Sequence, residues 1–334
     1  MSLRKSDRLR IPGKSVGQRS IQPTMDAIES QSALAPEDAA SLMRLATYSA
    51  VSVAVVLISA KAMAWLYSDS LSLLATLVDS CMDALASMIN LLAVRKALSP
   101  ADAEHRFGHG KFEPLAGLGQ AAFVAGSAVF LVVEGIRRII TPQPLEAFSL
   151  GIGVMLFAMA ATSALLLFQR HVVRRTGSLA IHADSLHYRT DLIVSASVIV
   201  SLVLAAFGWE GFDALFAMAI ALYIFYSAWS IAKQSLDQLL DRELPDAQRE
   251  DIIRLTLEHG LVRGMHDLRT RRAGITAFME LHIELDDDLS LLQAHQVGVE
   301  VKAKLQEQFR PAEILVHIDP ASVARDLPAR DFPL

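Results

Sequence analysis

The sequence has a single cysteine, Cys81, in a chain of 334 residues. One thiol cannot form a disulfide within the chain, and it cannot supply the several thiolates of a cysteine-based zinc cluster. Any metal site therefore depends on histidine, aspartate and glutamate side chains. A cleavable signal peptide is not expected either, because the segment before the first apolar run is long and polar and lacks a small-residue cleavage pattern.

Charged residues are scarce in the middle of the chain. They make up 20% of all residues, against 52% hydrophobic residues, and they concentrate near the two ends. The net charge of −5 gives no indication of nucleic-acid binding. The basic residues near the start are typical of a solvated tail, and contact with anionic lipid head groups is the alternative interpretation.

Six apolar stretches occupy the middle region, and each is close to the ~20 residues that a helix needs to cross a bilayer. A buried bundle in a soluble protein is the alternative, but six such runs joined by short loops favour a membrane domain. Lys and Arg are enriched in alternate loops, so both termini are expected on the cytoplasmic side. The stretches are residues 43–66, 71–94, 114–136, 148–169, 184–207 and 212–233.

The residues from about Asp241 onward have the pattern of a small soluble domain. Helices are expected over residues 245–258 and 291–309. Residues 275–285 and 313–319 alternate between apolar and polar side chains, which predicts two strands, and a further strand precedes them. The order helix, strand, strand, helix, strand predicts a compact α+β layer.

These patterns predict an α-helical membrane protein of six transmembrane helices with a C-terminal α+β cytoplasmic domain. Residues 1–40 are expected to form a disordered tail, and residues 41–238 the six-helix domain. Residues 239–324 are expected to form a cytoplasmic metal-binding domain, and residues 325–334 a C-terminal tail.

Four ionisable residues lie within or beside the predicted spans, where each is costly unless it has a function. Asp79 and Asp83 are four residues apart on the second span, and His187 and Asp191 repeat this spacing on the fifth. The spacing stacks each pair on one helix face. Three carboxylates and one imidazole without sulfur suit a tetrahedral divalent ion such as Zn²⁺. A set of hydrogen-bonded polar residues or a proton relay is the alternative.

A loop between the second and third spans contains a second set of possible ligands. Asp102, His105 and His109 are spaced to bind a metal ion, although solvated loops often have this composition. Asp184 and Lys61 also lie within or at the edge of predicted spans. We expect these two residues to lie around the intramembrane ligands or at an interface rather than to bind metal.

The soluble domain carries a third set, formed by His266, His282, His295, His317 and Asp319. Strand alternation places His282, His317 and Asp319 on polar faces rather than in the core. Each histidine taken singly is more often an ordinary surface residue. Their number within a short segment favours a cytoplasmic metal cluster.

Several ordered motifs give the chain a specific resemblance to a known family over residues 41–324. The chain resembles a cation diffusion facilitator, and in particular the bacterial zinc and ferrous-iron efflux members. The first forty residues fall outside this resemblance. The motifs are LVDSCMD (77–83), RFGHGK (106–111), ADSLHYRTD (183–191), LLDR (239–242), HDLRTR (266–271) and HIDP (317–320).

The resemblance implies a divalent metal cation/proton antiporter, not an enzyme, that exports Zn²⁺, Cd²⁺ or Fe²⁺ by alternating access. It implies a multi-pass homodimer in a bacterial inner membrane, a metallochaperone-like cytoplasmic domain, and bound zinc with no organic cofactor. The matching residues are Asp79, Asp83, His187 and Asp191 for the transport site, Asp102, His105 and His109 for a loop site, His266, His282, His295, His317 and Asp319 for a cytoplasmic cluster, and Lys111 and Asp241 for a salt bridge that locks the two domains of the dimer.

Two other classes of function are alternatives. An intramembrane metalloprotease is disfavoured, because the H-E-x-x-H motif is missing and no Ser or Cys nucleophile lies beside a base. A membrane metal sensor needs the cytoplasmic histidines but no ligands within the bilayer, so the intramembrane residues favour transport. The ligand types do not choose among Zn²⁺, Cd²⁺, Fe²⁺ and Mn²⁺, and an exporter selective for Fe²⁺ or Mn²⁺ is a further alternative.

Overall fold

The computed structural model describes residues 35–68, 71–140, 149–206 and 212–324. Residues 1–34 and 325–334, which make up most of the two predicted tails, lie outside these ranges. The first described helix begins at Pro36, so the last residues assigned to the N-terminal tail are helical. Glu37 and Asp38 lie in the first turn of this helix, where negative charge is favourable next to the positive end of the helix dipole.

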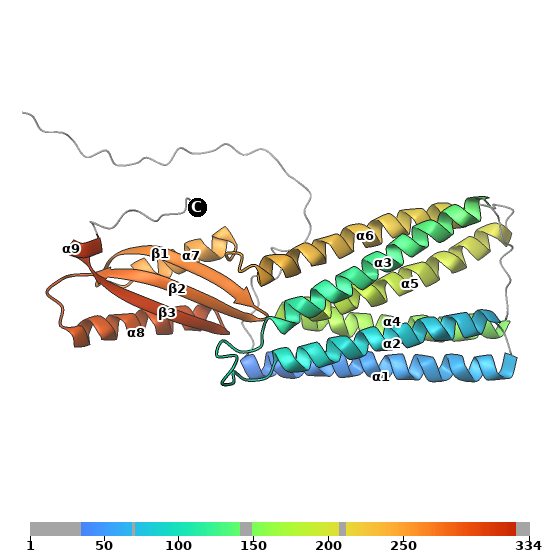
Figure 1. Ribbon diagram of the computed structural model, residues 1–334, viewed down its shortest axis with the longest axis horizontal. Coiled ribbons are helices and arrows are strands. Elements are labelled where there is room, and N and C mark those ends of the chain that lie inside the picture. The colour runs from blue at the N-terminus through green and yellow to red at the C-terminus, as the bar shows by residue number, and fades with distance from the viewer. Residues whose placement is uncertain (1–34, 69–70, 141–148, 207–211, 325–334) are drawn as a thin grey trace, which may run out of the picture. The chain divides into compact units, whose positions relative to one another are not determined.

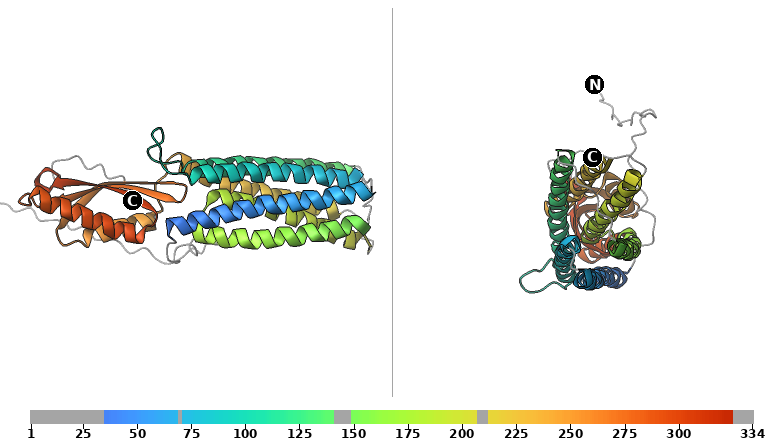
Figure 2. Two further views of the ribbon diagram at one scale, coloured as in Figure 1. Left: turned by 90° about the horizontal axis from the view of Figure 1, so that it is seen from below. Right: turned by 90° about the vertical axis from the view of Figure 1, so that its right-hand side faces the viewer.

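Six helices of 27 to 33 residues occupy the six predicted apolar stretches. Among them α1 packs against α2 and α4, α3 packs against α5 and α6, and α4 packs against α5. Figures 1 and 2 show them running alongside one another as a bundle. They are α1 (Pro36–Ser68), α2 (Leu71–Ala97), α3 (Phe112–Ile140), α4 (Ser149–Thr176), α5 (Leu179–Ala206) and α6 (Phe212–Leu239).

Among the described residues, four of these helices are long and apolar enough to cross a membrane. The apolar segments are Pro36–Tyr67, Thr76–Ala97, Phe112–Val133 and Gly153–Thr176. α5 has a comparable length, but Asp184, Arg189 and Asp191 fall in its first half and shorten its uncharged stretch. The predicted helical membrane domain is confirmed, and of these three charged residues Asp191 is one of the predicted transport-site ligands.

Small side chains allow the helices of the bundle to approach closely. Ala46 and Ala50 on α1 and Ala183 on α5 are almost completely buried. Tyr188 of α5 contacts both α2 and α1. Its hydroxyl lies 2.7 Å from the Ser87 Oγ on α2 and 3.4 Å from the Ala50 carbonyl oxygen on α1. This contact holds α5 against α2 next to the predicted ligands.

The remaining elements form the predicted α+β domain. A three-stranded sheet has the order β1-β2-β3, in which β2 pairs antiparallel with β1 and parallel with β3 (Figure 1). The predicted order of helix, strand, strand, helix, strand is confirmed, and one short helical turn follows it. The elements are α7 (Asp246–Leu257), β1 (Val262–Ala273), β2 (Thr276–Leu285), α8 (Leu291–Gln308), β3 (Ala312–Pro320) and α9 (Ala321–Ala324).

The core of this domain lies between one face of the sheet and the two helices α7 and α8. β2 alternates as expected, with Leu281 and Ile283 fully buried and the side chains between them on the opposite face. α8 begins with a capping box formed by Ser290 and Gln293 and buries Leu305 against the sheet. One face of the sheet is therefore apolar and covered, and the other carries the histidines.

Replacing Leu281 with alanine is expected to destabilise this domain by about 2–5 kcal/mol, because it leaves a cavity in the centre of the core. Leu281 is 0% exposed. The measurement is the hydrogen-exchange rate of the β2 backbone amides in the full-length protein. Leu291→Ala is the matched control, because Leu291 is 87% exposed at the start of α8. Equal exchange rates in the two variants would contradict the described core.

Candidate metal sites

The first group of possible metal ligands lies between α2 and α5, inside the helical bundle. Asp83 comes from α2, and His187 and Asp191 come from successive turns of α5. The His187 Nε2 atom lies 3.0 Å from the Asp83 Oδ1 atom and 3.6 Å from the Asp191 Oδ2 atom. One possible ligand atom from each residue lies within 4.8 Å of the other two. We call these three residues the membrane group.

The imidazole of His187 is enclosed by protein. Its side chain is 4% exposed, and the rings of Phe123 and Tyr188 lie within 5.6 Å and 5.4 Å of it, measured between centroids. The Nε2 atom is buried, and its short contact with Asp83 lacks hydrogen-bond geometry. A buried imidazole nitrogen beside two carboxylates suits a metal ion that all three residues would share.

The structure does not place the fourth predicted ligand, Asp79, within the membrane group. Asp79 lies one turn before Asp83 on α2, and its side chain is exposed in the single chain. Lys61 of α1 lies beside it. The Lys61 Nζ atom donates hydrogen bonds to the Ser80 Oγ at 2.5 Å and to the Thr76 carbonyl oxygen at 3.2 Å.

Asp184 also lies outside the membrane group, although it is only three residues before His187. It is 1% exposed and accepts a hydrogen bond of 2.6 Å from the Gln169 Nε2 on α4. Its other carboxylate oxygen is buried and has no hydrogen-bond partner. Asp184 therefore joins α5 to α4 rather than to α2.

The second group lies in the loop between α2 and α3, and we call Asp102, His105 and His109 the loop group. The two oxygens of Asp102 face different histidines: Oδ1 lies 3.2 Å from the His105 Nδ1, and Oδ2 lies 3.2 Å from the His109 Nε2. Gly108 adopts a φ of 77° between the histidines, a conformation that suits glycine in a tight turn. The loop thereby folds both imidazoles onto one carboxylate.

The charge states in the loop group suit a cation. The backbone N–H of His105 donates to Asp102 at 2.7 Å, and this bond is the main cause of a pKa for Asp102 below its ordinary value. Asp102 therefore remains an anion at neutral pH. The His109 side chain is 1% exposed, and its Nε2 atom has no hydrogen-bond partner.

The third group forms a row across the sheet of the soluble domain. His266 on β1 is paired in register with His282 on β2, and His282 is paired with His317 on β3. Side chains in register on adjacent strands lie on the same face and contact one another. The ring centroids are 5.1 Å apart for the first pair and 4.5 Å apart for the second.

Asp319 joins the three histidines, and we call these four residues the sheet group. The Asp319 Oδ2 atom lies 2.8 Å from the His282 Nδ1 and 3.5 Å from the His266 Nε2. The Asp319 Oδ1 atom lies 3.2 Å from the His317 Nε2. As in the other two groups, one imidazole nitrogen, the Nε2 of His266, is buried without a hydrogen-bond partner.

Two acidic residues that the sequence did not mark contact the sheet group. The Glu284 Oε1 atom lies 3.0 Å from the His266 Nδ1, and the Asp267 Oδ2 atom lies 4.0 Å from the His282 Nε2. Strand alternation puts Glu284 on the same face as His282, so the sequence pattern could have identified Glu284 as a neighbour of the histidines. Asp267 lies in a register irregularity of β1 and has a φ of 48°, which a sequence pattern does not reveal.

The fifth predicted residue of this cluster, His295, is not brought to the sheet group in the single chain. It is exposed on α8, whose other face packs on the apolar side of the sheet. A Cβ atom at Gly298 would lie 3.2 Å from the Ile318 side chain, which shows how closely α8 approaches that side. His282 and His317 point to the opposite side.

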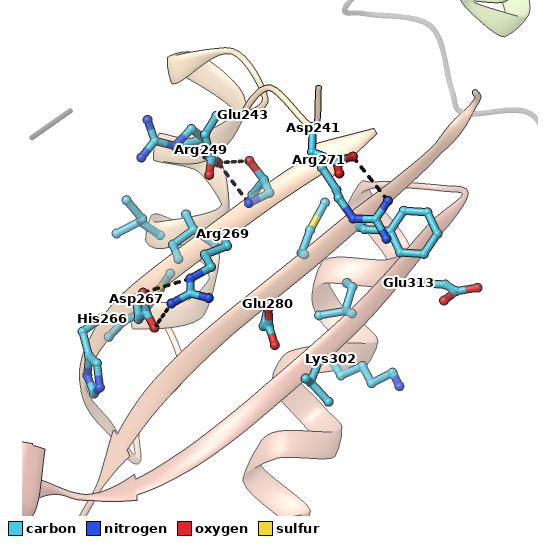
Figure 3. A pocket seen from close by; sticks show the side chains of 18 of the residues that line it. Asp241, Glu243, Arg249, His266, Asp267, Arg269, Arg271, Glu280, Lys302 and Glu313 are labelled. Carbon is cyan, nitrogen blue, oxygen red and sulfur yellow. Dashed lines mark hydrogen bonds and ion pairs between the residues drawn. The ribbon is translucent and has the colours of Figure 1, made fainter. Parts of the chain in front are cut away.

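A pocket of about 1320 Å³ borders the sheet group at His266 and Asp267 (Figure 3). Its lining mixes both signs of charge with apolar side chains. Arg269 and Asp267 face each other in an ion pair of 3.0 Å, and Glu280 points into the space between the labelled side chains. Figure 3 also shows Arg271 paired with Asp241, whereas Glu280, Lys302 and Glu313 carry no dashed line to another residue drawn there.

The predicted partners Lys111 and Asp241 lie in contact. The Lys111 Nζ atom is 2.9 Å from the Asp241 Oδ1, and Asp241 adopts a φ of 56° where α6 ends. Arg271 of β1 lies 3.6 Å from the same oxygen and stacks over the Phe278 ring with its guanidinium carbon 4.2 Å from the centroid. An acidic residue between two cations ties the start of α3, the end of α6 and β1 together.

A buried acidic residue, not marked by the sequence, lies close to this contact. Glu113 in the first turn of α3 is 2% exposed and accepts hydrogen bonds from the Ser178 side chain and the backbone N–H groups of Leu179 and Ala180. Arg272 at the end of β1 supplies the opposite charge. Burial lowers the pKa of the Arg272 guanidinium below its ordinary value. Glu113 therefore anchors the start of α5, the helix that carries His187 and Asp191.

The turn between β1 and β2 fits closely against the start of α3. A Cβ atom at Gly110 would lie 2.5 Å from the Ala273 carbonyl oxygen, so only glycine fits there without movement. Gly274 adopts a φ of 61° in the turn itself. Ile275 packs against a buried cluster from α1, α2, α4 and α5 that includes Met43.

Comparison with known proteins agrees with this arrangement. Residues 47–240 match the family model described as the cation efflux transmembrane domain, and residues 244–321 match the one described as the cation efflux protein, cytoplasmic domain. The chain belongs to the cation efflux family, also known as the cation diffusion facilitators. The resemblance carried by the sequence motifs is thereby confirmed.

Curated relatives match this cation efflux protein over most of its length. It is 45% identical over 282 residues to the cation-efflux pump FieF of Klebsiella pneumoniae subsp. pneumoniae. It is 46% identical to FieF of Citrobacter koseri over 282 residues and 46% identical to FieF of Yersinia pestis over 281 residues. Each match covers 84% of this chain and 94% of the relative.

The family establishes the general activity. This cation efflux protein is a multi-pass membrane transporter that exports divalent metal ions, and its family is one of transporters rather than enzymes. The three ligand groups described above are therefore candidate binding sites for the exported ion or for ions of the same kind.

Proposed function

We propose that this protein exports Zn²⁺ from the cytoplasm in exchange for protons, by alternating access, and that it accepts Cd²⁺ and Fe²⁺ less readily. One observation carries the proposal: Asp83, His187 and Asp191 converge from two helices inside the bundle. Nitrogen and carboxylate oxygen ligands without sulfur suit Zn²⁺. We place Asp79, one turn before Asp83 on α2, in the same site as a fourth ligand.

Metal ions and protons compete for the same atoms in such a site. Neighbouring carboxylates repel one another in a medium of low dielectric constant, so the group is stabilised either by a divalent ion or by protons. Binding the ion releases protons, and releasing the ion lets protons return. A metal-loaded form open to the cytoplasm and a protonated form open to the other side then exchange ions across the membrane.

The test is a flux assay in proteoliposomes that contain a Zn²⁺-sensitive dye and, in parallel vesicles, a pH-sensitive dye. We expect Zn²⁺ entry driven by a pH gradient, with proton movement in the opposite direction. The same assay with Cd²⁺, Fe²⁺ and Mn²⁺ ranks the metals. Tight Zn²⁺ binding without flux would contradict the proposal and favour a membrane metal sensor, and faster flux of Fe²⁺ or Mn²⁺ would contradict the choice of zinc.

We further propose that the protein resides in the inner membrane of a bacterium with both termini in the cytoplasm. Basic residues near the ends of two helices support this orientation: Arg95 and Lys96 on α2, and Arg174 and Arg175 on α4. The family models support a membrane domain over residues 41–238 and a cytoplasmic domain over residues 239–324. Reporter fusions at each terminus, active only on one side of the membrane, test the orientation.

The sheet group is proposed to bind zinc and to stabilise a homodimer of the cytoplasmic domain. The donor set of three imidazoles and one carboxylate fits Zn²⁺, and the buried Nε2 of His266 without a partner supports the fit. A zinc ion bound by the sheet group would link the three strands.

The loop group offers a similar donor set, and we propose that it binds metal as well. We propose that the contact between Lys111 and Asp241 stabilises the domain arrangement of the dimer.

Zinc is expected to raise the midpoint of thermal unfolding of the soluble domain in the full-length protein. A ligand that binds only the folded state at one hundred times its Kd stabilises that state by about 2.7 kcal/mol. His282→Ala is expected to remove most of this shift, whereas His259→Ala should retain it, because His259 pairs with Glu300 away from the sheet group. An unchanged midpoint with and without Zn²⁺ would count against the cluster.

A further inference from the structure

A lysine lies within the first membrane-spanning helix, and the transport cycle described above does not use it. Lys61 falls inside the apolar segment Pro36–Tyr67 of α1. A charged side chain within a membrane span is costly and is retained where it has a partner or a task.

The contacts of Lys61 fix its ammonium group against the part of α2 that carries the acidic ligands. Its Nζ atom donates to the Ser80 Oγ and to the Thr76 carbonyl oxygen. Ser80 is 3% exposed, so its hydroxyl is firmly packed. Both partners are neutral, so they hold the ammonium in place without cancelling its charge.

The positive charge of Lys61 acts on the neighbouring carboxylates. It interacts favourably with Asp79, which is adjacent to Ser80, and with Asp191 on α5. The other charged groups that act on these two carboxylates are Asp83 and His187, and Asp79 and Asp191 also repel each other. A fixed positive charge near a cation site weakens the attraction for a divalent ion, and the effect is strong where the dielectric constant is low.

We propose that Lys61 is a fixed counter-charge of the transport site, which limits how tightly the site holds a divalent ion and so permits its release. It is a positioning residue and not a ligand, because an ammonium group has no lone pair to donate. The inference rests on the proposed function, since it assumes that the ion passes Asp79, Asp83 and Asp191.

The test compares transport kinetics of Lys61 variants in Zn²⁺ flux assays. Lys61→Met is expected to lower the KM for Zn²⁺ by about tenfold and to lower kcat, because the ion is bound more tightly and released more slowly. Lys61→Gln, which keeps a hydrogen-bond donor without the charge, should behave in the same way. Lys61→Arg keeps the charge and should leave the KM near the wild-type value.

Ser80→Ala separates charge from packing, because it removes a hydrogen-bond acceptor and leaves the ammonium charge in place. We expect its KM to stay near that of the wild type. An unchanged KM in both neutral variants, or the same KM shift in Lys61→Met and Lys61→Arg, would overturn the counter-charge role. Normal wild-type flux together with such a result overturns this inference alone, whereas wild-type vesicles without Zn²⁺ flux would overturn the proposed function and this inference with it.

Discussion

Replacing Asp191 with alanine is expected to reduce Zn²⁺ flux in proteoliposomes to the level of protein-free vesicles. Asp191 lies one turn after His187 on α5, with its Oδ2 atom 3.6 Å from the imidazole nitrogen. Removing it leaves only Asp79, Asp83 and His187 of the four proposed ligands, with one negative charge fewer, an incomplete set for replacing the hydration shell of a divalent ion in the bilayer. The loss should therefore be at least about a hundredfold, beyond the 10–100-fold effects of residues that only support metal ligands.

The control for this variant is Ser197→Ala, on the same helix. The Ser197 hydroxyl donates to the Val194 carbonyl oxygen of its own helix and contacts no residue of the membrane group. Its flux should match the wild type. Wild-type flux in Asp191→Ala, with normal expression and folding, would show that the ion takes another route and that the membrane group is not the transport site.

Replacing Glu113 with alanine is expected to produce the largest loss of stability outside the core of the soluble domain. The change removes the acceptor for the Ser178 side chain and for two backbone N–H groups at the start of α5, and it removes a negative charge that interacts favourably with Arg272. Leaving a buried donor without its acceptor typically costs about 1–3 kcal/mol for each group. The midpoint of thermal unfolding of the detergent-solubilised protein should fall, and Zn²⁺ flux should fall with it.

A matched control is available for Glu113. Glu37 occupies the first turn of α1 as Glu113 occupies the first turn of α3, but it is exposed. Glu37→Ala should change stability by no more than a few tenths of a kcal/mol. If both variants unfolded at the wild-type temperature, Glu113 would not contribute to the anchoring of α5.

The sequence predicts the architecture well because its signals are local and repeated. Apolar runs of transmembrane length and the period-two alternation of residues 275–285 each specify an element without knowledge of the rest of the chain. The boundaries are less well predicted. The first apolar run begins near residue 43, yet the helix begins at Pro36, because polar residues extend a helix beyond its apolar part.

The candidate ligands depend on pairings that a local pattern does not contain. The spacing of His187 and Asp191 predicts a shared helix face, but the approach of Asp83 depends on how α2 packs on α5. Helix spacing likewise placed Asp79 beside Asp83, but its side chain is exposed and is not among the three close residues of the membrane group. The functions of these residues stay predictions until the variants are measured.

In the soluble domain, too, the sequence pattern does not reveal which residues of different elements come into contact. Alternation puts His282 and His317 on polar faces, but only the strand order places them next to each other. Strand alternation does not predict whether His295 joins the other histidines, because His295 lies on a helix and a helix can pack on either face of a sheet. Glu113 escaped notice because it is an ordinary charged residue at the edge of its helix, and only tertiary packing buries it.

The order of the strands sets when the row of histidines can assemble during protein synthesis. His266 and His282 lie on the hairpin of β1 and β2, whereas His317 and Asp319 lie on β3, the last strand within the described residues. A polypeptide released by the ribosome before residue 317 would keep α1 to α6 and yet lack two of the four residues of the sheet group. The complete group therefore requires translation through β3.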